Sequence, residues 1–171
     1  PLKLMQKNQV IRDKMQSRFD FVMVDEFQDT NATQMLLIDQ LSARNRNIAV
    51  VGDDDQSIYG WRGAEVKNIL NFPQRYKNCE VVRLERNYRS SGKILDLANS
   101  IISNNKTRHT KILKPGKQSV GEVPEMFVYD DENMEVDQVV SELFEFQKQG
   151  YRWRDMAILY RSNSQGGLME G

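Results

Sequence analysis

Two acidic residues stand side by side at Asp25-Glu26, directly after the mainly apolar residues 19–24. That run predicts a short buried strand, so both carboxylates would emerge at its carboxyl end. Magnesium prefers one or two carboxylates together with waters and phosphate oxygens, so one acid could hold Mg²⁺ while the other orients an attacking water. The alternative is a helix N-cap followed by a solvated acid. These two residues alone leave both interpretations open.

A second acidic cluster, Asp53-Asp54-Asp55, follows another predicted buried strand at residues 47–51. The polar string Arg86-Asn87-Tyr88-Arg89 follows a third predicted strand at residues 80–84. In parallel α/β sheets, ligands bind beyond the carboxyl ends of the strands. We therefore expect these polar segments to gather with Asp25-Glu26 at one edge of a sheet.

An aromatic ring and a cation are neighbours at Trp61-Arg62, in a loop with glycines at positions 60 and 63. Glycine allows the backbone to approach a ligand closely. The pair suits single-stranded nucleic acid, because each base stacked on an aromatic ring contributes about 1–3 kcal/mol with little sequence preference. Tyr59 offers a second surface. The alternative is that Trp61 is a packing residue.

Short apolar strands and amphipathic helices alternate along the chain and would position these segments. Strands are predicted at residues 19–24, 47–51, 80–84, 125–129 and 155–160. Helices are predicted at residues 2–16, after the cap Asn31, at residues 65–71 before Pro73, after Ser90 or Ser91, and around residues 136–144. This alternation indicates an α/β fold with a parallel sheet, right-handed crossovers and helices on both faces. Residues 162–171 are expected to form an unfinished tail.

The composition limits the number of domains and the classes of protein to which the chain can belong. The 171 residues predict one domain or two small or incomplete ones, with about 8,700 Å² of accessible surface when folded. Lysine plus arginine and aspartate plus glutamate both number 24, so the net charge is zero and any nucleic-acid site must be local. With a single cysteine, no export signal and no apolar run near about 20 residues, we expect a cytoplasmic protein without a membrane partner.

Residues 105–118 are basic and contain no acid, and Pro115-Gly116 predicts a loop there. The basic residues are Lys106, Arg108, Lys111, Lys114 and Lys117. They could bind phosphates, although a solvated charge run is the commoner explanation. His109 and the lone Cys79 are given no functional role.

Three longer strings make the interpretation more specific. VDEFQDTN at residues 24–31, GDDDQSIYGWRGA at 52–64 and LERNYRSS at 84–91 closely resemble the UvrD/Rep-type superfamily 1 DNA helicases, and AILYRSNSQ at 157–165 extends the resemblance. In that family these segments lie on the facing edges of two RecA-like domains, with ATP in the cleft and single-stranded DNA across the top. The resemblance implies RecA-like parallel sheets flanked by helices, in parts of two adjacent domains.

The resemblance also implies roles for single residues. Asp25 resembles the magnesium-binding acid, Glu26 the residue that activates the hydrolytic water, and Gln56 the polar sensor of the terminal phosphate. Tyr88 resembles the tyrosine that stacks on adenine, and Arg89 the arginine that reaches the γ-phosphate from the second domain. The alternatives are that Gln56 is a loop amide bonded to backbone and that Arg89 is a surface partner of a nearby acid, Glu85 or Glu26.

For DNA, the resemblance points to Tyr59, Trp61 and Arg62, and it matches Arg161 and Asn163 to family positions near the DNA backbone. The implied domains are residues 1–79, the C-terminal half of the first RecA-like domain preceded by a helix returning from an inserted subdomain, and residues 80–171, the N-terminal part of the second. The implied ligands are ATP, Mg²⁺, single-stranded DNA and duplex junctions.

One family element has no counterpart here. A phosphate-binding loop G-x-x-x-x-G-K-[ST] is missing from the sequence, because Gly116-Lys117 is followed by Gln118 and has no glycine five residues before it. We expect a fragment of an ATP-dependent helicase that is inactive alone, with the other helicase domains outside this chain. Gly166-Gly167 also departs from the family pattern. A non-catalytic nucleic-acid or protein-binding module remains the alternative, and a phospho-acceptor domain would leave Tyr88-Arg89 without a role.

Overall fold

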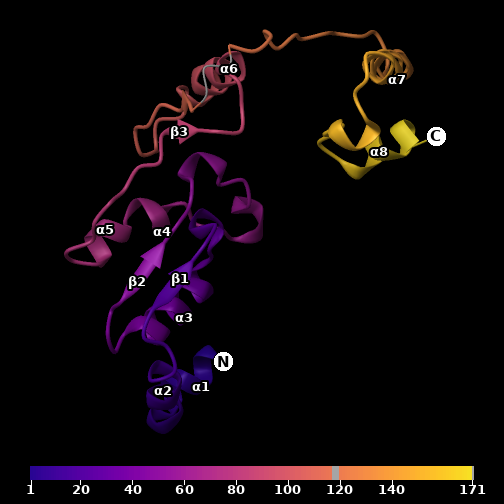
Figure 1. Cartoon of the computed structure of the whole chain (residues 1–171). Helices are drawn as coiled ribbons and strands as arrows, with labels where there is room; N and C mark the ends of the chain where they lie inside the picture. Colours follow the sequence, from indigo (N-terminus) through magenta and orange to yellow (C-terminus); the bar gives the residue numbers. More distant parts are fainter. Residues whose placement is uncertain (117–119, 171) are drawn as a thin grey trace. The chain divides into compact units, whose positions relative to one another are not determined.

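The computed structural model describes residues 1–116 and 120–170. The chain divides into two compact units, Pro1–Val123 and Pro124–Gly171. Figure 1 traces both along the sequence, from the N-terminal helices to the C-terminal helix α8.

A parallel pair of strands lies at the centre of the first unit. Strands β1 (Val22–Val24) and β2 (Ile48–Val50) pair in the register Val22↔Ile48, Met23↔Ala49 and Val24↔Val50 (Figure 1). The pairing continues past the strands, because the Phe27 N–H donates to the Val51 carbonyl at 2.9 Å. The structure therefore confirms a parallel α/β arrangement for the two segments that carry acidic residues at their ends.

Helix α3 (Ala32–Ser42) connects β1 to β2 and packs on β1. It begins at Asn31, as predicted, with a reciprocal capping box. The Asn31 Oδ1 accepts from the Gln34 N–H at 2.9 Å, and the Gln34 Oε1 accepts from the Asn31 N–H at 2.9 Å. Two orphan backbone donors at the helix start are thus satisfied by two side chains.

The main core is small and lies between α3, the β1–β2 pair and two short helices, α4 (Lys67–Leu70) and α5 (Phe72–Arg75). Its buried members are Phe27, Met35, Phe72 and Tyr76. Phe27 meets Phe72 edge-on with ring centroids 5.4 Å apart, and Phe72 stacks on Tyr76 at 4.5 Å. Cys79 packs against this core.

One predicted helix is divided in two, and the helix predicted at residues 65–71, which is α4, is followed by the short helix α5 that was not predicted. Residues 2–16 form α1 (Leu2–Lys7) and α2 (Gln9–Gln16), because Asn8 adopts an extended backbone and its side chain caps the Ile11 N–H at 3.0 Å. Pro73 does not end the helix before it. Instead it lies in the first turn of α5, where a missing N–H costs no hydrogen bond.

The rest of the first unit contains α6 (Gly92–Ile102) and a second parallel pair, β3 (Arg86–Asn87) with β4 (Lys114–Pro115). Helix α6 begins after Ser91, as predicted, although the Ser91 side chain makes no capping bond. Asn99 ties α6 to the chain before β4, donating to the Leu113 carbonyl at 3.0 Å and accepting from its N–H at 3.1 Å. Part of the predicted loop at 105–118 is thus β4, while Lys117 and Gln118 lie outside the described residues.

The second unit is mostly helical. Helix α7 (Glu132–Lys148) is capped by the Asp131 carboxylate and is followed by Gly150 at φ 100°. The expected tail is wrong for most of its length, because residues 163–170 form helix α8 (Asn163–Glu170). Gly166 is buried, and a Cβ there would lie 2.7 Å from the Tyr160 hydroxyl oxygen. The contact gives Gly166 a packing reason, whereas Gly167 faces open space.

Three predicted strands are not formed. Residues 80–84, 125–129 and 156–160 are extended without strand pairing, and residues 153–155 form a short 3-10 helix, η4 (Trp153–Asp155). A strand requires a neighbour for its backbone hydrogen bonds, and within the described residues these segments pair with no other strand. Their apolar side chains stay exposed, as Leu84, Val128 and Leu159 show.

The accessible surface reflects these missing pairings. It measures 13657 Å², well above the about 8,700 Å² expected for a compact chain of this mass. The size-based expectation is therefore wrong, because few apolar side chains outside the main core are buried. Within residues 1–116 and 120–170, no helix is long and apolar enough to cross a membrane.

We predict that Met35→Ala lowers the free energy of unfolding by about 2–5 kcal/mol, since it removes buried methylene groups and leaves a cavity in the core. The neighbouring Leu36 is 45% exposed on the same helix, so Leu36→Ala serves as the matched control with a smaller loss. Urea titrations of both variants measure the difference. Equal losses at the two positions would contradict the core as described.

Candidate active site

The two acidic segments lie at one edge of the β1–β2 pair. Asp25-Glu26 follows β1 directly, and Asp53 follows β2 after two residues. Because the strands run parallel and in register, their carboxyl ends coincide. The structure therefore brings together two of the three polar segments that the sequence assigned to a common edge.

Glu26 has a left-handed backbone, with φ 49° and ψ 43°. This conformation is unfavourable for a residue with a Cβ, by about 1–2 kcal/mol. The Glu26 N–H donates to the Asp25 Oδ1 at 2.9 Å, and the next residue, Phe27, is held by its burial and by its bond to Val51. The turn then continues as the 3-10 helix η1 (Phe27–Asp29). The surrounding structure thus keeps the Glu26 carboxylate at the strand end.

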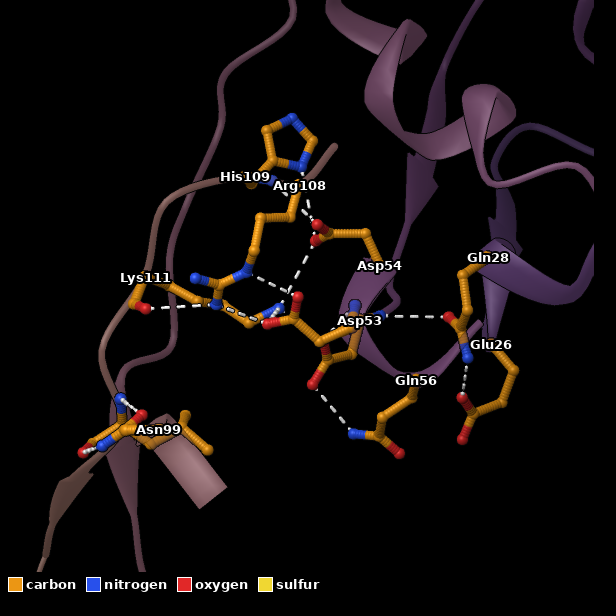
Figure 2. Close-up of polar contacts among 11 residues, drawn as sticks. Glu26, Gln28, Asp53, Asp54, Gln56, Asn99, Arg108, His109 and Lys111 are labelled. Carbon is orange, nitrogen blue, oxygen red and sulfur yellow. Dashed lines mark hydrogen bonds and ion pairs between the residues drawn. The ribbon is translucent and has the colours of Figure 1, made fainter. Parts of the chain in front are cut away.

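A chain of hydrogen bonds joins Glu26 to the second acidic segment (Figure 2). The buried Gln28 amide donates from Nε2 to the Glu26 Oε2 at 2.8 Å, and its Oε1 accepts from the Asp53 N–H at 3.0 Å. The Asp53 carboxylate in turn accepts from the Gln56 Nε2 at 2.8 Å. Glu26 and Gln56, which the sequence assigned to catalysis, are therefore linked through Gln28 and Asp53, to which it assigned no such role. The Gln56 amide binds a carboxylate rather than backbone, so that alternative is wrong.

Gly52 makes room for this arrangement. A Cβ at position 52 would lie 2.6 Å from the Gln28 Oε1 and 2.9 Å from the Ile69 Cδ1, both closer than side chains pack. Any larger residue would displace the Gln28 amide or α4. Sequence reasoning missed both Gln28 and Gly52, and the only available signal was their position inside the two acidic strings.

The basic residues 108–111 cover the second acidic segment, whose residues 54–56 form the 3-10 helix η2 (Asp54–Gln56) (Figure 2). The Arg108 guanidinium binds both oxygens of Asp55, at 2.7 Å from Nε and 2.6 Å from Nη2. The Lys111 ammonium lies among all three aspartates, bonded to Asp53 and 3.3 Å and 3.1 Å from Asp54 and Asp55. The acidic cluster is thus largely neutralised by two cations about 55 residues further along the chain.

Two protonation equilibria follow from this packing. Burial alone would raise the pKa of Asp55, but hydrogen bonds from Arg108 and Lys111 outweigh it and the pKa lies below its ordinary value. Burial alone would lower the pKa of Lys111, but hydrogen bonds to Asp53 and Asp55 outweigh it and the pKa is raised. Both groups therefore stay charged at neutral pH.

These contacts correct the interpretation of residues 105–118 as a solvated charge run. Arg108 and Lys111 pair within the chain, so they are not free to hold DNA phosphates in this structure. His109 also contacts the cluster, with its backbone N–H donating to the Asp54 Oδ2 at 2.7 Å. Lys106 and Lys114 are exposed. The complementary charges of the two segments were a signal that could have predicted the pairing.

Tyr88 and Arg89 lie after β3, in a turn held by Asn87. The Asn87 Oδ1 accepts from the Arg89 N–H at 2.9 Å and from the Ser90 N–H at 2.8 Å. The Tyr88 ring lies against Gly116, where a Cβ would be 2.5 Å from the Tyr88 Cδ1. Within residues 1–116 and 120–170, neither side chain is bonded to the acids of the β1–β2 edge, and no ion pair involves Arg89. The alternative pairing of Arg89 with Glu85 or Glu26 is therefore not found.

The aromatic loop is exposed and cationic. It forms the 3-10 helix η3 (Gly60–Arg62), with Trp61 75% exposed. The Arg62 guanidinium lies 4.9 Å from the centre of the Trp61 ring and 5.5 Å from that of Tyr59. Trp61 is not buried in a core in this structure, so the packing alternative is wrong.

Backbone contacts attach this loop to the end of the first acidic string. The Glu65 N–H donates to the Thr30 carbonyl at 3.0 Å, and Asn31 forms an isolated bridge with Ala64. Residues 30–31, at the end of the acidic string that follows β1, therefore attach the aromatic loop to this part of the site.

The remaining DNA-assigned residues belong to the second unit. Arg161 is exposed, and Asn163 is the first residue of α8. The Gln165 Oε1 accepts from the Arg161 N–H at 2.9 Å and from the Ser162 N–H at 3.0 Å, which shapes the turn before α8.

The Asp25 carboxylate is suited to supply one protein ligand to a magnesium ion. Its carboxylate is exposed at the strand end, and one of its oxygens is oriented by the Glu26 N–H. The described residues contain no group of three His, Cys, Asp or Glu side chains that could hold a metal alone. One exposed carboxylate is a ligand of the kind that Mg²⁺ takes, since this ion binds one or two carboxylates and fills its other positions with waters and phosphate oxygens.

Acidic residues at the carboxyl edge of parallel strands define a candidate nucleotide site of α/β type. Residues 1–77 match the family model of the UvrD/REP helicase N-terminal domain, and residues 82–170 match that of the UvrD-like helicase C-terminal domain. The chain belongs to the UvrD/Rep helicase family, which confirms the resemblance of its sequence strings.

Curated relatives agree with this membership. The chain is 43% identical over 155 residues to the ATP-dependent DNA helicase PcrA of Staphylococcus aureus strains such as COL, and 42% identical to that of Staphylococcus epidermidis ATCC 12228. These alignments cover 91% of this chain but 21% of each relative. The chain thus spans about a fifth of the length of the relatives it matches.

We predict that Asp55→Asn lowers the melting temperature by several degrees at pH 6, because it removes the negative charge and one of the two acceptor oxygens that Arg108 and Lys111 share. The folded-state pKa of Asp55 is depressed, so its stabilisation is present above the ordinary aspartate pKa of about 4 and disappears as pH falls through the lower folded value. Thermal melts between pH 3 and 7 should show the gap between wild type and variant closing below about pH 4.

Asp96→Asn provides the control, since Asp96 is an exposed acid on α6. Its melting temperature should follow that of the wild type throughout. A gap for Asp55→Asn that is independent of pH would contradict the role of the Asp55 charge.

Proposed function

We propose that this chain is part of an ATP-dependent DNA helicase that couples ATP hydrolysis to movement along single-stranded DNA and to duplex unwinding. The observation that carries the proposal is the hydrogen-bond chain from Glu26 through Gln28 and Asp53 to Gln56, at the carboxyl edge of two parallel strands. It joins a general base candidate to a polar group suited to a terminal phosphate. Family membership and the PcrA relatives support the same activity.

In this proposal the first unit supplies the hydrolytic groups. Asp25 holds Mg²⁺, which when bound neutralises charge on the phosphates. Glu26 accepts a proton from the water that attacks the γ-phosphorus, and the bond to the β-phosphate oxygen breaks to yield ADP and phosphate. Gln56 contacts the γ-phosphate and reports its presence through Asp53.

Tyr88 and Arg89 complete the nucleotide site. The exposed Tyr88 ring is free to stack on adenine, and the Arg89 guanidinium, unpaired among the described residues, neutralises charge that develops on the γ-phosphate. An arginine supplied in this way is worth about 10³–10⁵ in rate. We expect Tyr88 and Arg89 to move toward the acidic edge when nucleotide binds.

In the proposed DNA site, the rings of Trp61 and Tyr59 stack on bases, and Arg62, which lies over both rings, contacts the DNA backbone. Arg161 and Asn163 of the second unit are proposed as further DNA-binding residues. We assign residues 1–79 and 80–171 to parts of two RecA-like domains. The family matches, which change between residues 77 and 82, support this division. The compact units of the structure divide elsewhere, after Val123.

The isolated chain should not hydrolyse ATP, because the backbone amides and lysine of a phosphate-binding loop are not among its residues. Experiments on activity therefore use the full-length helicase that carries this chain. Duplex junctions, the second proposed DNA partner, are tested there with forked substrates.

We predict that Glu26→Gln in the full-length helicase lowers kcat for DNA-stimulated ATP hydrolysis by about 10²–10⁴, because the amide cannot accept a proton. ATP binding should persist, since the substitution is isosteric. Steady-state hydrolysis and binding of a fluorescent ATP analogue measure the two effects. Glu125→Gln, at an exposed acid, is the control and should leave both unchanged. Normal turnover by Glu26→Gln would remove Glu26 from this role.

We predict that Trp61→Ala weakens binding of an oligothymidylate by about 1–3 kcal/mol, roughly 5- to 150-fold, through loss of a stacking surface. Trp61→Phe should recover much of the affinity because it keeps an aromatic ring. Ile58→Ala, at a 70% exposed aliphatic residue close by in the sequence, should have little effect. Fluorescence anisotropy measures the binding, and equal losses for Trp61→Ala and Ile58→Ala would argue against stacking.

A further inference from the structure

Gln28 is one of the most deeply buried side chains of the first unit, with 1% of its surface exposed. It is polar, and both ends of its amide are bonded: Nε2 to the Glu26 carboxylate at 2.8 Å and Oε1 to the Asp53 N–H at 3.0 Å. Its neighbour in the chain, Phe27, carries the hydrophobic packing of this turn. A buried amide between two site segments requires an explanation beyond core packing.

The chemistry of its partners determines which way the amide points. The Asp53 backbone N–H can only donate, so it must face the Gln28 oxygen. An ionised carboxylate can only accept, so Glu26 must face the Gln28 nitrogen. A flipped amide would place donor against donor and acceptor against acceptor. Gln28 therefore has one favourable orientation, and this orientation donates to Glu26.

Neighbouring groups hold Gln28 in place. Gly52 lacks the Cβ that would come within 2.6 Å of the Gln28 Oε1. The Ser57 hydroxyl donates to the Gln28 backbone carbonyl at 3.3 Å, which holds the main chain at this residue. The side-chain amide is held by the Asp53 N–H, on the β2 side of the edge, and donates to Glu26 on the β1 side.

Glu26 depends on this contact. Within residues 1–116 and 120–170, Gln28 is the one side chain that donates to the Glu26 carboxylate, and the bond engages Oε2. The Glu26 Oε1 has no hydrogen bond there. One oxygen is consequently anchored and the other is available to a water, which is the arrangement that a positioned general base requires.

We propose that Gln28 is a positioning residue for hydrolysis: it orients the Glu26 carboxylate and ties that orientation to the Asp53–Gln56 segment. This inference rests on the proposed function, since it assigns Gln28 a role in that reaction. The Gln56 amide binds the Asp53 carboxylate, and the Asp53 N–H binds the Gln28 amide. A movement of Gln56 is therefore transmitted to Glu26 through the side-chain amide of Gln28. Loss of the amide leaves both segments in place but no longer oriented to each other.

The test is made in the full-length helicase with Gln28→Met, which keeps the length of the side chain and removes both hydrogen bonds. DNA-stimulated kcat should fall about 10- to 100-fold, as for other partners that orient a functional carboxylate, while KM for ATP stays within about threefold. Gln28→Leu also removes both hydrogen bonds with a different apolar shape, and it should lower kcat in the same way.

Gln34→Met is the matched control. Gln34 also uses its amide oxygen to bind a backbone N–H, in the capping box of α3, but it does not contact Glu26. Its loss should lower the melting temperature without lowering kcat. If Gln28→Met does not fold, as judged by thermal melting and by binding of a fluorescent ATP analogue, Gln28→Leu decides the question.

A double-mutant comparison separates positioning from general destabilisation. In the Glu26→Gln background, Gln28→Met should cause no further loss of kcat, because the group that it orients is gone. Unchanged kcat in both Gln28 variants, an equal additional loss in the Glu26→Gln background, or a rise in KM alone would each overturn the proposal. A wild-type protein without DNA-stimulated hydrolysis would instead refute the proposed function itself.

Discussion

The parallel pairing of β1 with β2 is the interaction on which the rest of the site depends. It brings the carboxyl ends of two strands into register and continues through the bond from Phe27 to Val51. Asp25-Glu26 and the segment after Gly52 therefore leave the sheet at the same edge. The core of Phe27, Met35, Phe72 and Tyr76 packs behind this edge and holds Glu26 in a backbone conformation that it would not adopt alone.

Local charge pairing explains how a chain with no net charge can have strongly charged segments. The acid-rich turn after β2 is matched by Arg108 and Lys111, so that its charges are satisfied inside the protein rather than by solvent. The same contact ties residues near β4 to the candidate active site. Charge in this region therefore serves assembly of the site, while the exposed cation of the aromatic loop, Arg62, remains available to a ligand.

The sequence predicted helices best where a local signal and an apolar face coincide. Asn31 caps α3, and α6 and α7 form where their apolar positions recur at helical spacing. Strands at residues 80–84, 125–129 and 155–160 were predicted from apolar runs but are not formed, because strand formation depends on a partner that a run of side chains does not specify. The break at Asn8 and the place of Pro73 inside α5 follow from capping and first-turn geometry, which periodicity does not distinguish.

By itself, the sequence determined the family, the two acidic strand ends and the residues proposed to act on nucleotide and DNA, because these depend on residue types in fixed local order. Only the tertiary structure decided that Gln28 joins Glu26 to Asp53, that Gly52 makes room for it, and that Arg108 and Lys111 neutralise the aspartates. The bonds from Gln28 to Asp53 and from Arg108 and Lys111 to the aspartates join residues more than 20 positions apart, and the role of Gly52 depends on a space that no local pattern records. Physical proximity across the β1–β2 edge, rather than spacing along the chain, therefore completes the site.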